Sequence, residues 1–377
     1  MLVVKPLILS YTYINKTNRN QVKFMRLLYD KVYEHICKVD FESIWEGFHA
    51  YHFALYDDKK VYFKDKTIMY EECFLGNTSI KYDDEQIAIW KIDDYSKEDP
   101  IELAANMVHE MFHAYQYELG EKRFPNDILA LDYPVILENV LLKHAENQLI
   151  ARAVKEKDKK KIKEYISNII TSRFKRKELI KDHIDYEYRI ETVEGMAEYA
   201  GLLALKQLDS EKYTDKINNY FNNLADIEHI LFDNRRLSYF SGSLFLLSLH
   251  NTDISVFHDI STEKRTVYEL ISESIPSGNL PETVNTDTIE TSLKTFLKNR
   301  QKLFDEFFDK SPICTEGSFT ICGYDPMNMV KTENLVWCKY FVILKEKAKD
   351  NPLLINGPLV IKVDKSDTFK VLAYYTI

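Results

Sequence analysis

Two histidines and a glutamate at helical spacing are the residues of this chain with the clearest chemistry. His109 and His113 are four residues apart, and Glu110 directly follows the first of them. Side chains four apart on an α-helix lie on one face about one turn apart, so both imidazoles can bind one metal ion. A glutamate beside them can take a proton from a water molecule that the metal activates. This HExxH pattern predicts a zinc site with Glu110 as general base.

The residues around this pattern predict a well-bounded helix. Asp99 is a typical N-cap, Pro100 suits the first helical position, and Glu102 follows three residues after the cap. Apolar residues continue at helical spacing, and Gly120 is typical of the position after a helix end. We therefore predict a helix over 100–119 with one buried face. The alternative is that both histidines are only structural, as caps or as core residues.

A catalytic zinc ion usually has three protein ligands and one open position. In the extended motif with a third histidine, positions 116 and 119 would be glycine and histidine. This chain has Gln116 and Leu119 there, which excludes that class. A carboxylate from a second helix is the other common third ligand.

A predicted helix over 186–208 offers such carboxylates. Glu191, Glu194 and Glu198 share one face, at spacing i, i+3 and i+7. Three acids on an otherwise apolar segment are unfavourable in a core unless a cation meets them. Zinc with the groups that orient its histidines would satisfy this requirement, and Glu191 and Glu198 are candidates for orienting the histidines or for binding a cationic group of the substrate. A small residue such as Gly195 would let two helices approach closely. The alternative is an acidic stripe that faces solvent.

Other residues compete for the third position. Glu138, at the start of a predicted helix over 134–157, is a rival ligand or a hydrogen-bond acceptor for a ligand histidine. Glu146 follows two turns later on the same face. Cys73, upstream of the HExxH motif, is a further alternative.

The HExxH motif followed by the segment Glu194–Tyr199 (EGMAEY) resembles the gluzincins, zinc metallopeptidases whose third ligand is a glutamate on a second helix. The resemblance implies an α+β, zincin-like fold, a Zn²⁺ cofactor, peptide-bond hydrolysis and Glu194 as third ligand. The segment that begins at Tyr239 (YFSGSL) is similar to one in aminopeptidase-like gluzincins, which implies that Tyr239 stabilises the oxyanion. The spacer between His113 and Glu194 is longer than in many gluzincins, so its helices would form an insertion. No aminopeptidase GxMEN-like motif precedes HExxH, so exopeptidase activity is not implied.

Bulk properties narrow the remaining classes. The 377 residues are 45% hydrophobic, and a net charge of −9 argues against a nucleic-acid partner. No apolar run is long enough to cross a membrane. Five scattered cysteines without a CxxC pair fit reduced thiols in the cytoplasm. We expect a cytoplasmic hydrolase acting on a peptide or protein. The alternative is a catalytically inactive zinc-binding scaffold or regulatory protein.

Sequence texture divides the chain into three regions: 1–97 with mixed α/β pattern, 98–310 dominated by helical periodicity, and 311–377 rich in β pattern. In the first region we expect a strand at the N-terminus, a helix near 18–39, and strands at 61–63, 67–70, 79–82 and 86–92. Further helices are expected at 159–172, 211–223, 239–250 and 288–308, and C-terminal strands at 318–322, 335–344, 358–363 and 369–375. A peptide substrate is expected to pair with a sheet edge near 86–92.

Basic residues are concentrated in one segment of the chain, over 152–181. Between Arg152 and Lys181 the chain has twelve Lys or Arg and four Asp or Glu. The expected reading is a solvated helical surface with a buried isoleucine stripe. The alternative is a surface for nucleic acid or an acidic partner.

Overall fold

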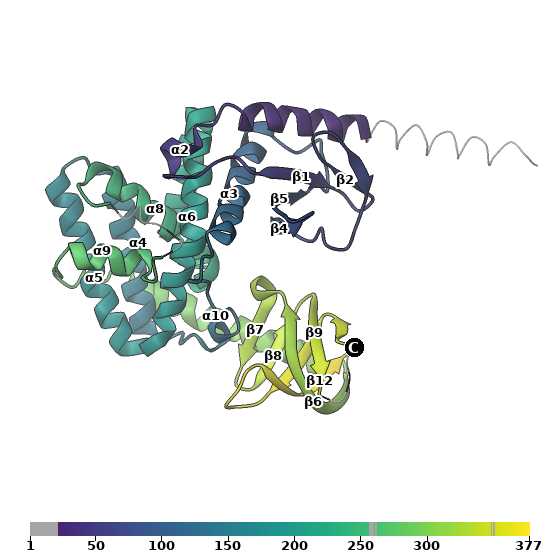
Figure 1. Cartoon of the computed structure of the whole chain (residues 1–377). Helices are drawn as coiled ribbons and strands as arrows, with labels where there is room; N and C mark the ends of the chain where they lie inside the picture. Colours follow the sequence, from purple (N-terminus) through teal and green to yellow (C-terminus); the bar gives the residue numbers. More distant parts are fainter. Residues whose placement is uncertain (1–21, 256–259, 261, 348, 350) are drawn as a thin grey trace, which may run out of the picture. The chain divides into compact units, whose positions relative to one another are not determined.

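The computed structural model describes residues 22–255, 260, 262–347, 349 and 351–377. It has both helices and sheets, as an α+β fold requires, and forms two compact units (Figure 1). The described residues of the first unit lie within 1–122, 193–220 and 255–264, and those of the second within 123–192, 221–254 and 265–377. Across these described residues, no helix is long and apolar enough to cross a membrane. The expected N-terminal strand lies outside the described residues, and the division of the sequence at 97 and 310 stays a prediction.

A five-stranded sheet forms the base of the first unit. Its strands are β1 (His52–Tyr56), β2 (Lys60–Tyr62), β3 (Thr67–Met69), β4 (Thr78–Tyr82) and β5 (Glu85–Lys91). The order is β3-β2-β1-β5-β4, with β1 and β5 parallel and the other neighbours antiparallel. β-Branched and aromatic residues such as Val61, Phe74, Ile87 and Ile89 form a buried core on it.

The structure corrects two sequence predictions about this sheet. β1 was not predicted, because its apolar run lacks the alternation that distinguishes a strand from a buried helix. β5 occupies 85–91, as expected, but it pairs with β1 on one side and β4 on the other. The prediction of a free sheet edge near 86–92 is therefore wrong, because a strand with two neighbours has no unpaired backbone groups to offer a peptide.

Helices cover this sheet. Residues 22–36 are helical, α2 spans Phe41–Ile44, and α3 spans Pro100–Glu118 and packs against β5 and β4. The predicted ends of α3 are confirmed. The side chain of Asp99 accepts hydrogen bonds from the backbone of Ile101 and Glu102, at 2.9 and 3.1 Å, and Gly120 follows with φ +74°. The HExxH helix is thus set by its own local sequence.

The second helix of the site, α6 (Ile184–Leu208), reaches the first unit from Val193 onward. It lies close to α3 at Gly201, where a β-carbon would be 3.0 Å from the carbonyl oxygen of Ala105 and 3.3 Å from Cβ of His109. A close approach of the two helices thus occurs at Gly201, and the one expected at Gly195 stays a prediction. α7 (Ser210–Ala225) follows α6.

The second unit combines helices with a C-terminal sheet. Its helices, besides the first part of α6, are α4 (Leu137–Lys155), α5 (Lys159–Ile180), α8 (Asn234–Ser248), α9 (Val267–Ser274) and α10 (Thr286–Phe308). Short 3₁₀ turns lie at η1 (Leu129–Asp132), η2 (Lys181–His183), η3 (Ile230–Phe232), η4 (Leu249–Asn251) and η5 (Pro326–Asn328). α9 was not predicted, although its capping box at Thr266 and Glu269 is a sequence signal for a helix start.

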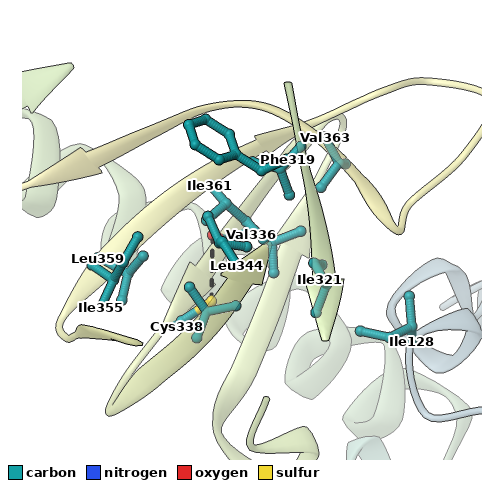
Figure 2. Close-up of a cluster of buried hydrophobic side chains, with 12 residues drawn as sticks. Ile128, Phe319, Ile321, Val336, Cys338, Leu344, Ile355, Leu359, Ile361 and Val363 are labelled. Atoms are coloured by element: carbon teal, nitrogen blue, oxygen red, sulfur yellow. Dashed lines mark hydrogen bonds between the residues drawn. The ribbon is translucent and has the colours of Figure 1, made fainter. Parts of the chain in front are cut away.

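Seven antiparallel strands form the C-terminal sheet, in the order β10-β9-β6-β12-β11-β8-β7. They are β6 (Ile313–Tyr324), β7 (Met329–Thr332), β8 (Leu335–Cys338), β9 (Phe341–Glu346), β10 (Leu353–Asn356), β11 (Leu359–Val363) and β12 (Lys370–Thr376). The predicted single strand over 335–344 is two strands, β8 and β9. Figure 2 shows the core on this sheet, where Ile128 lies near Ile321.

Candidate metal centre

Three atoms that can bind a metal converge between α3 and α6 in the first unit. Nε2 of His109 and Nε2 of His113 are 3.2 Å apart. Oε2 of Glu194 is 3.1 Å from Nε2 of His113 and 3.8 Å from that of His109. Among the described residues, this is the group of His, Cys, Asp or Glu side chains whose ligand atoms gather closely enough to hold one ion. The structure therefore brings together the three residues expected as ligands.

These distances suit a tetrahedral ion. Zinc bonds to nitrogen and oxygen are about 2.1 Å long, which separates two ligand atoms by about 3.4 Å at the tetrahedral angle. The three observed separations, 3.1, 3.2 and 3.8 Å, bracket this value. Imidazole nitrogens with a carboxylate oxygen are also a donor set that zinc commonly takes. The residues present fit the ion.

Each histidine is oriented through its other ring nitrogen. Nδ1 of His109 donates to Oε2 of Glu198 at 2.9 Å, and Nδ1 of His113 donates to Oε1 of Gln116 at 2.8 Å. Gln116 is itself held, because its Nε2 donates to the carbonyl of Val193 at 2.9 Å. With Nδ1 protonated, a neutral imidazole presents a lone pair at Nε2. Both Nε2 atoms then face the carboxylate of Glu194, and a metal ion could bind among these three atoms.

The predicted orienting role of Glu198 thus has its hydrogen bond, whereas Gln116 was missed. Gln116 was considered only as the position where another class of zinc peptidase has glycine. The signal for it was present in the sequence, because it follows His113 by three residues on the same helix. Acceptors that hold a ligand histidine are general in metal sites.

Glu198 is fixed in turn by α7. It accepts a hydrogen bond from the hydroxyl of Tyr220, and Nζ of Lys216 lies 3.2 Å from its Oε1. Burial of Glu198 raises its pKa, but the attraction of Lys216 and the hydrogen bonds outweigh it, so the pKa lies well below the usual value. An ionised Glu198 can only accept, which keeps the Nδ1 proton on His109.

Without a metal ion, the imidazole of His113 would hold a proton at neutral pH. Burial lowers the pKa of His113, but the carboxylates of Glu194 and Glu110 outweigh it and raise this pKa to about 9. The site therefore attracts positive charge strongly enough to protonate an imidazole at neutral pH.

Glu110 directly follows His109 on α3 and is buried. Burial raises its pKa above the usual value, and the charges of the two histidines oppose this in part. No hydrogen bond to its carboxylate is found from any described residue. The carboxylate thus lies within the electrostatic field of both imidazoles, and its role as general base stays a prediction.

The other predicted carboxylates belong to different surroundings in the second unit. Glu191 receives two hydrogen bonds from Arg173, at 2.7 and 2.8 Å, and one from Ser241 at 2.6 Å, so the prediction that it orients a histidine is wrong. Glu146 accepts from the guanidinium groups of α5. Glu138 is exposed at the start of α4, and it is not among the converging ligand atoms. Cys73 is also exposed and lies 3.9 Å from Glu71.

Two of the twelve basic residues of the 152–181 run are not on a solvated surface. Arg173 and Arg176 are fully buried and bind the glutamates Glu146, Glu187 and Glu191, while most of the other basic side chains face solvent. The isoleucine stripe is buried as expected. The run is therefore in part an internal ion-pair network.

Two tyrosines bear on the predicted oxyanion contact. Tyr239 lies on α8 in the second unit, with Cζ of Arg235 5.9 Å from its ring centroid, and its role stays a prediction. Tyr117 lies one turn after His113 on α3. Burial and the carboxylates of Glu194 and Glu110 raise the pKa of Tyr117, because its phenol is within the field of both acids.

No family model, curated protein or solved structure matches this chain. The resemblance to gluzincins therefore depends on the short motifs and stays an expectation.

Proposed function

We propose that this protein is a zinc-dependent hydrolase of the gluzincin type, with a zincin-like fold, which cleaves peptide bonds. One observation carries the proposal: Nε2 of His109, Nε2 of His113 and Oε2 of Glu194 converge within 4.8 Å, and both imidazoles are oriented through Nδ1. Such orientation is typical of metal ligands. The buried Glu110 beside them supports a catalytic site over a purely structural one.

The proposed chemistry assigns each residue one task. Zinc, when bound, polarises the scissile carbonyl and lowers the pKa of water toward about 7. Glu110 takes the proton from that water and passes it to the leaving amine. The raised pKa of Glu110 suits a group that must both accept and return a proton. Glu198 and Gln116 keep the histidines in place throughout.

The sheet order supports one mode of substrate binding. β4 pairs with β5 on one side and ends the sheet on the other, and α3 packs against it. An extended peptide would add to β4 through main-chain hydrogen bonds. This proposal replaces the expected edge at 86–92.

Metal analysis of the purified protein tests the ligand set. We expect one zinc per wild-type chain, loss of most of it in Glu194→Ala, and full retention in Glu138→Ala, which removes an exposed carboxylate. Full zinc retention by Glu194→Ala would refute the third ligand. Wild-type protein that holds no transition metal after zinc supplementation would refute the function.

A peptide library then tests catalysis. General-base catalysis contributes about 10²- to 10⁴-fold, so Glu110→Gln is expected to reduce hydrolysis by that factor while zinc content is unchanged. Zinc binding without hydrolysis of any peptide would favour the inactive scaffold or regulatory protein instead.

Substitution of each tyrosine in turn tests which one donates a hydrogen bond to the oxyanion. If the phenol of Tyr117 stabilises the oxyanion, Tyr117→Phe lowers kcat about 10²-fold with little change in KM, and Tyr239→Phe has no such effect. The reverse result would assign the contact to Tyr239.

A further inference from the structure

The second unit contains a cavity of about 860 Å³, separate from the residues of the metal centre. It is bounded by η1, η3, the start of α8, α10 and β7. A volume of this size lies within the range of small-molecule sites, about 300–1,000 Å³. The cavity is therefore large enough for an organic ligand.

A guanidinium group on its wall lacks an anionic partner. Arg300, from α10, donates through Nη2 to the carbonyl of Lys331, whereas its buried Nε has no hydrogen-bond partner among the described residues. No ion pair joins Arg300 to any described carboxylate. Burial lowers the pKa of Arg300, and the negative charge of Asp132 opposes this shift only in part. A guanidinium in this state favours an added anion.

The neighbouring cations differ from Arg300 in this respect. Arg235 is paired with Asp127, and Lys331 with Asp132 and Thr368. Arg235 and Lys331 thus each have a carboxylate partner within the protein, whereas no ion pair to a described carboxylate is found for Arg300.

The rest of the wall suits an apolar body with some polar groups. Phe232 and Phe296 are stacked, with ring centroids 4.8 Å apart, and Leu303 and Met329 add further apolar surface. Ser292 and other hydroxyl residues of α10 also face the cavity. Apolar side chains thus share the wall with many polar and charged ones, which include the carboxylates of Glu228 and Asp233.

We propose that this cavity binds a small organic anion, in which an apolar, flat body lies against Phe232 and Phe296 and the anionic group pairs with Arg300. The site is independent of the proposed hydrolase activity. A carboxylate, sulfonate or phosphate monoester meets the requirement, because each presents oxygens that a guanidinium can bind.

Two matched fluorescent probes test the proposal with the full chain. 8-Anilinonaphthalene-1-sulfonate carries an anion on an aromatic body, and N-phenyl-1-naphthylamine has the same body without the charge. We expect one anionic probe per chain, bound at least tenfold more tightly than the neutral probe. Arg300→Gln, which keeps a donor for the carbonyl of Lys331, should abolish that difference. Lys298→Gln, which removes an exposed charge from the same helix, should leave it unchanged.

A variant that fills the cavity locates the probes. Ser292→Trp should weaken binding of both probes by at least tenfold, while circular dichroism and the melting temperature remain close to wild type. Equal affinity of the wild-type protein for the two probes would overturn the proposal, whether or not the variants fold. Probe binding unaffected by Ser292→Trp would also overturn it, because the probe would then lie elsewhere.

Discussion

Glutamates serve different purposes in the metal centre and in the buried ion-pair network of the second unit. Both take glutamates from α6: Glu194 and Glu198 in the first unit, Glu187 and Glu191 in the second. In the second unit the acids Glu146, Glu187 and Glu191 meet the three cations Lys143, Arg173 and Arg176, all with side chains at most 3% exposed. In the metal centre, Glu194 instead faces the lone pairs of two imidazoles.

The network of the second unit balances its own charges, whereas we propose that the metal centre takes up an external cation. The charges of three acids and three bases balance in the network. The hydroxyl groups of Tyr133, Ser172 and Ser241 each donate a further hydrogen bond to one of the three carboxylates. A buried ion pair without both partners is costly, so each member depends on the others. The metal centre instead gathers two imidazole nitrogens and one carboxylate oxygen, the donor set of a metal ion, which is why an ion is proposed there.

The largest expected effect comes from opening the network. Glu187 accepts hydrogen bonds from Lys143 at 2.7 Å, from Arg176 and from Tyr133. Glu187→Gln removes one of the three acids that balance the buried cations, and we expect the free energy of unfolding to fall by about 3–5 kcal/mol in denaturant titrations. Asp185→Asn on the same helix removes a partly exposed partner of Lys177, with a loss below about 1 kcal/mol. Equal losses would show that the network is not a closed unit.

Glu194→Gln, the same change in the metal centre, should act through zinc instead. A ligand present at 100 times its Kd stabilises a protein by about 2.7 kcal/mol, and we expect this zinc-dependent increment in the wild type. Glu194→Gln should lose the increment, whereas Glu187→Gln should keep it from a lower starting stability. Thermal melts with zinc and with a chelator measure it. An increment that survives Glu194→Gln would contradict the comparison.

Loss of an orienting group should have a smaller effect. Gln116→Leu removes the acceptor for Nδ1 of His113 and leaves the ligand atoms in place. Changes of this kind lower metal affinity about 10- to 100-fold. Competition with a chromophoric chelator gives the Kd. Gln116→Glu restores an acceptor and should lose less, and identical losses in the two variants would indicate a packing effect.

The smallest effect is a pH dependence of zinc binding. In the metal-free protein the pKa of His113 is raised to about 9, so below that pH a bound proton must leave before zinc binds. Zinc affinity should therefore rise with pH, by up to about tenfold per unit below pH 9, and level off above it. Calorimetry in buffers of different ionisation enthalpy should detect about one proton released at pH 7.5. No release would place the proton elsewhere.

The HExxH histidines and the limits of their helix could be predicted because they depend on residues that are close in sequence. Helix geometry alone places His109 and His113 one turn apart, and the cap at Asp99 and the turn at Gly120 set the limits of α3. The same reasoning located α6 and its acidic residues. Strand β1 and helix α9 were not predicted, because a short apolar strand and a helix of about two turns both have weak periodicity.

The partners of those residues were decided by tertiary structure. Glu191 and Glu194 are three residues apart and chemically identical, yet one meets Arg173 of α5 and the other His113 of α3. Spacing along one helix cannot distinguish them, because each partner comes from a distant segment of the chain.

The sequence by itself thus determined the HExxH pair, its helix and a set of candidate acids, since these depend on contacts within one or two turns. The family resemblance had already indicated Glu194, and tertiary structure decided that its carboxylate converges with both imidazoles. It also assigned Gln116 and Glu198 to the histidines and buried Arg173 within what looked like a solvated basic run. The physical reason is that a buried charge takes its role from the group that faces it, and packing between helices chooses that group.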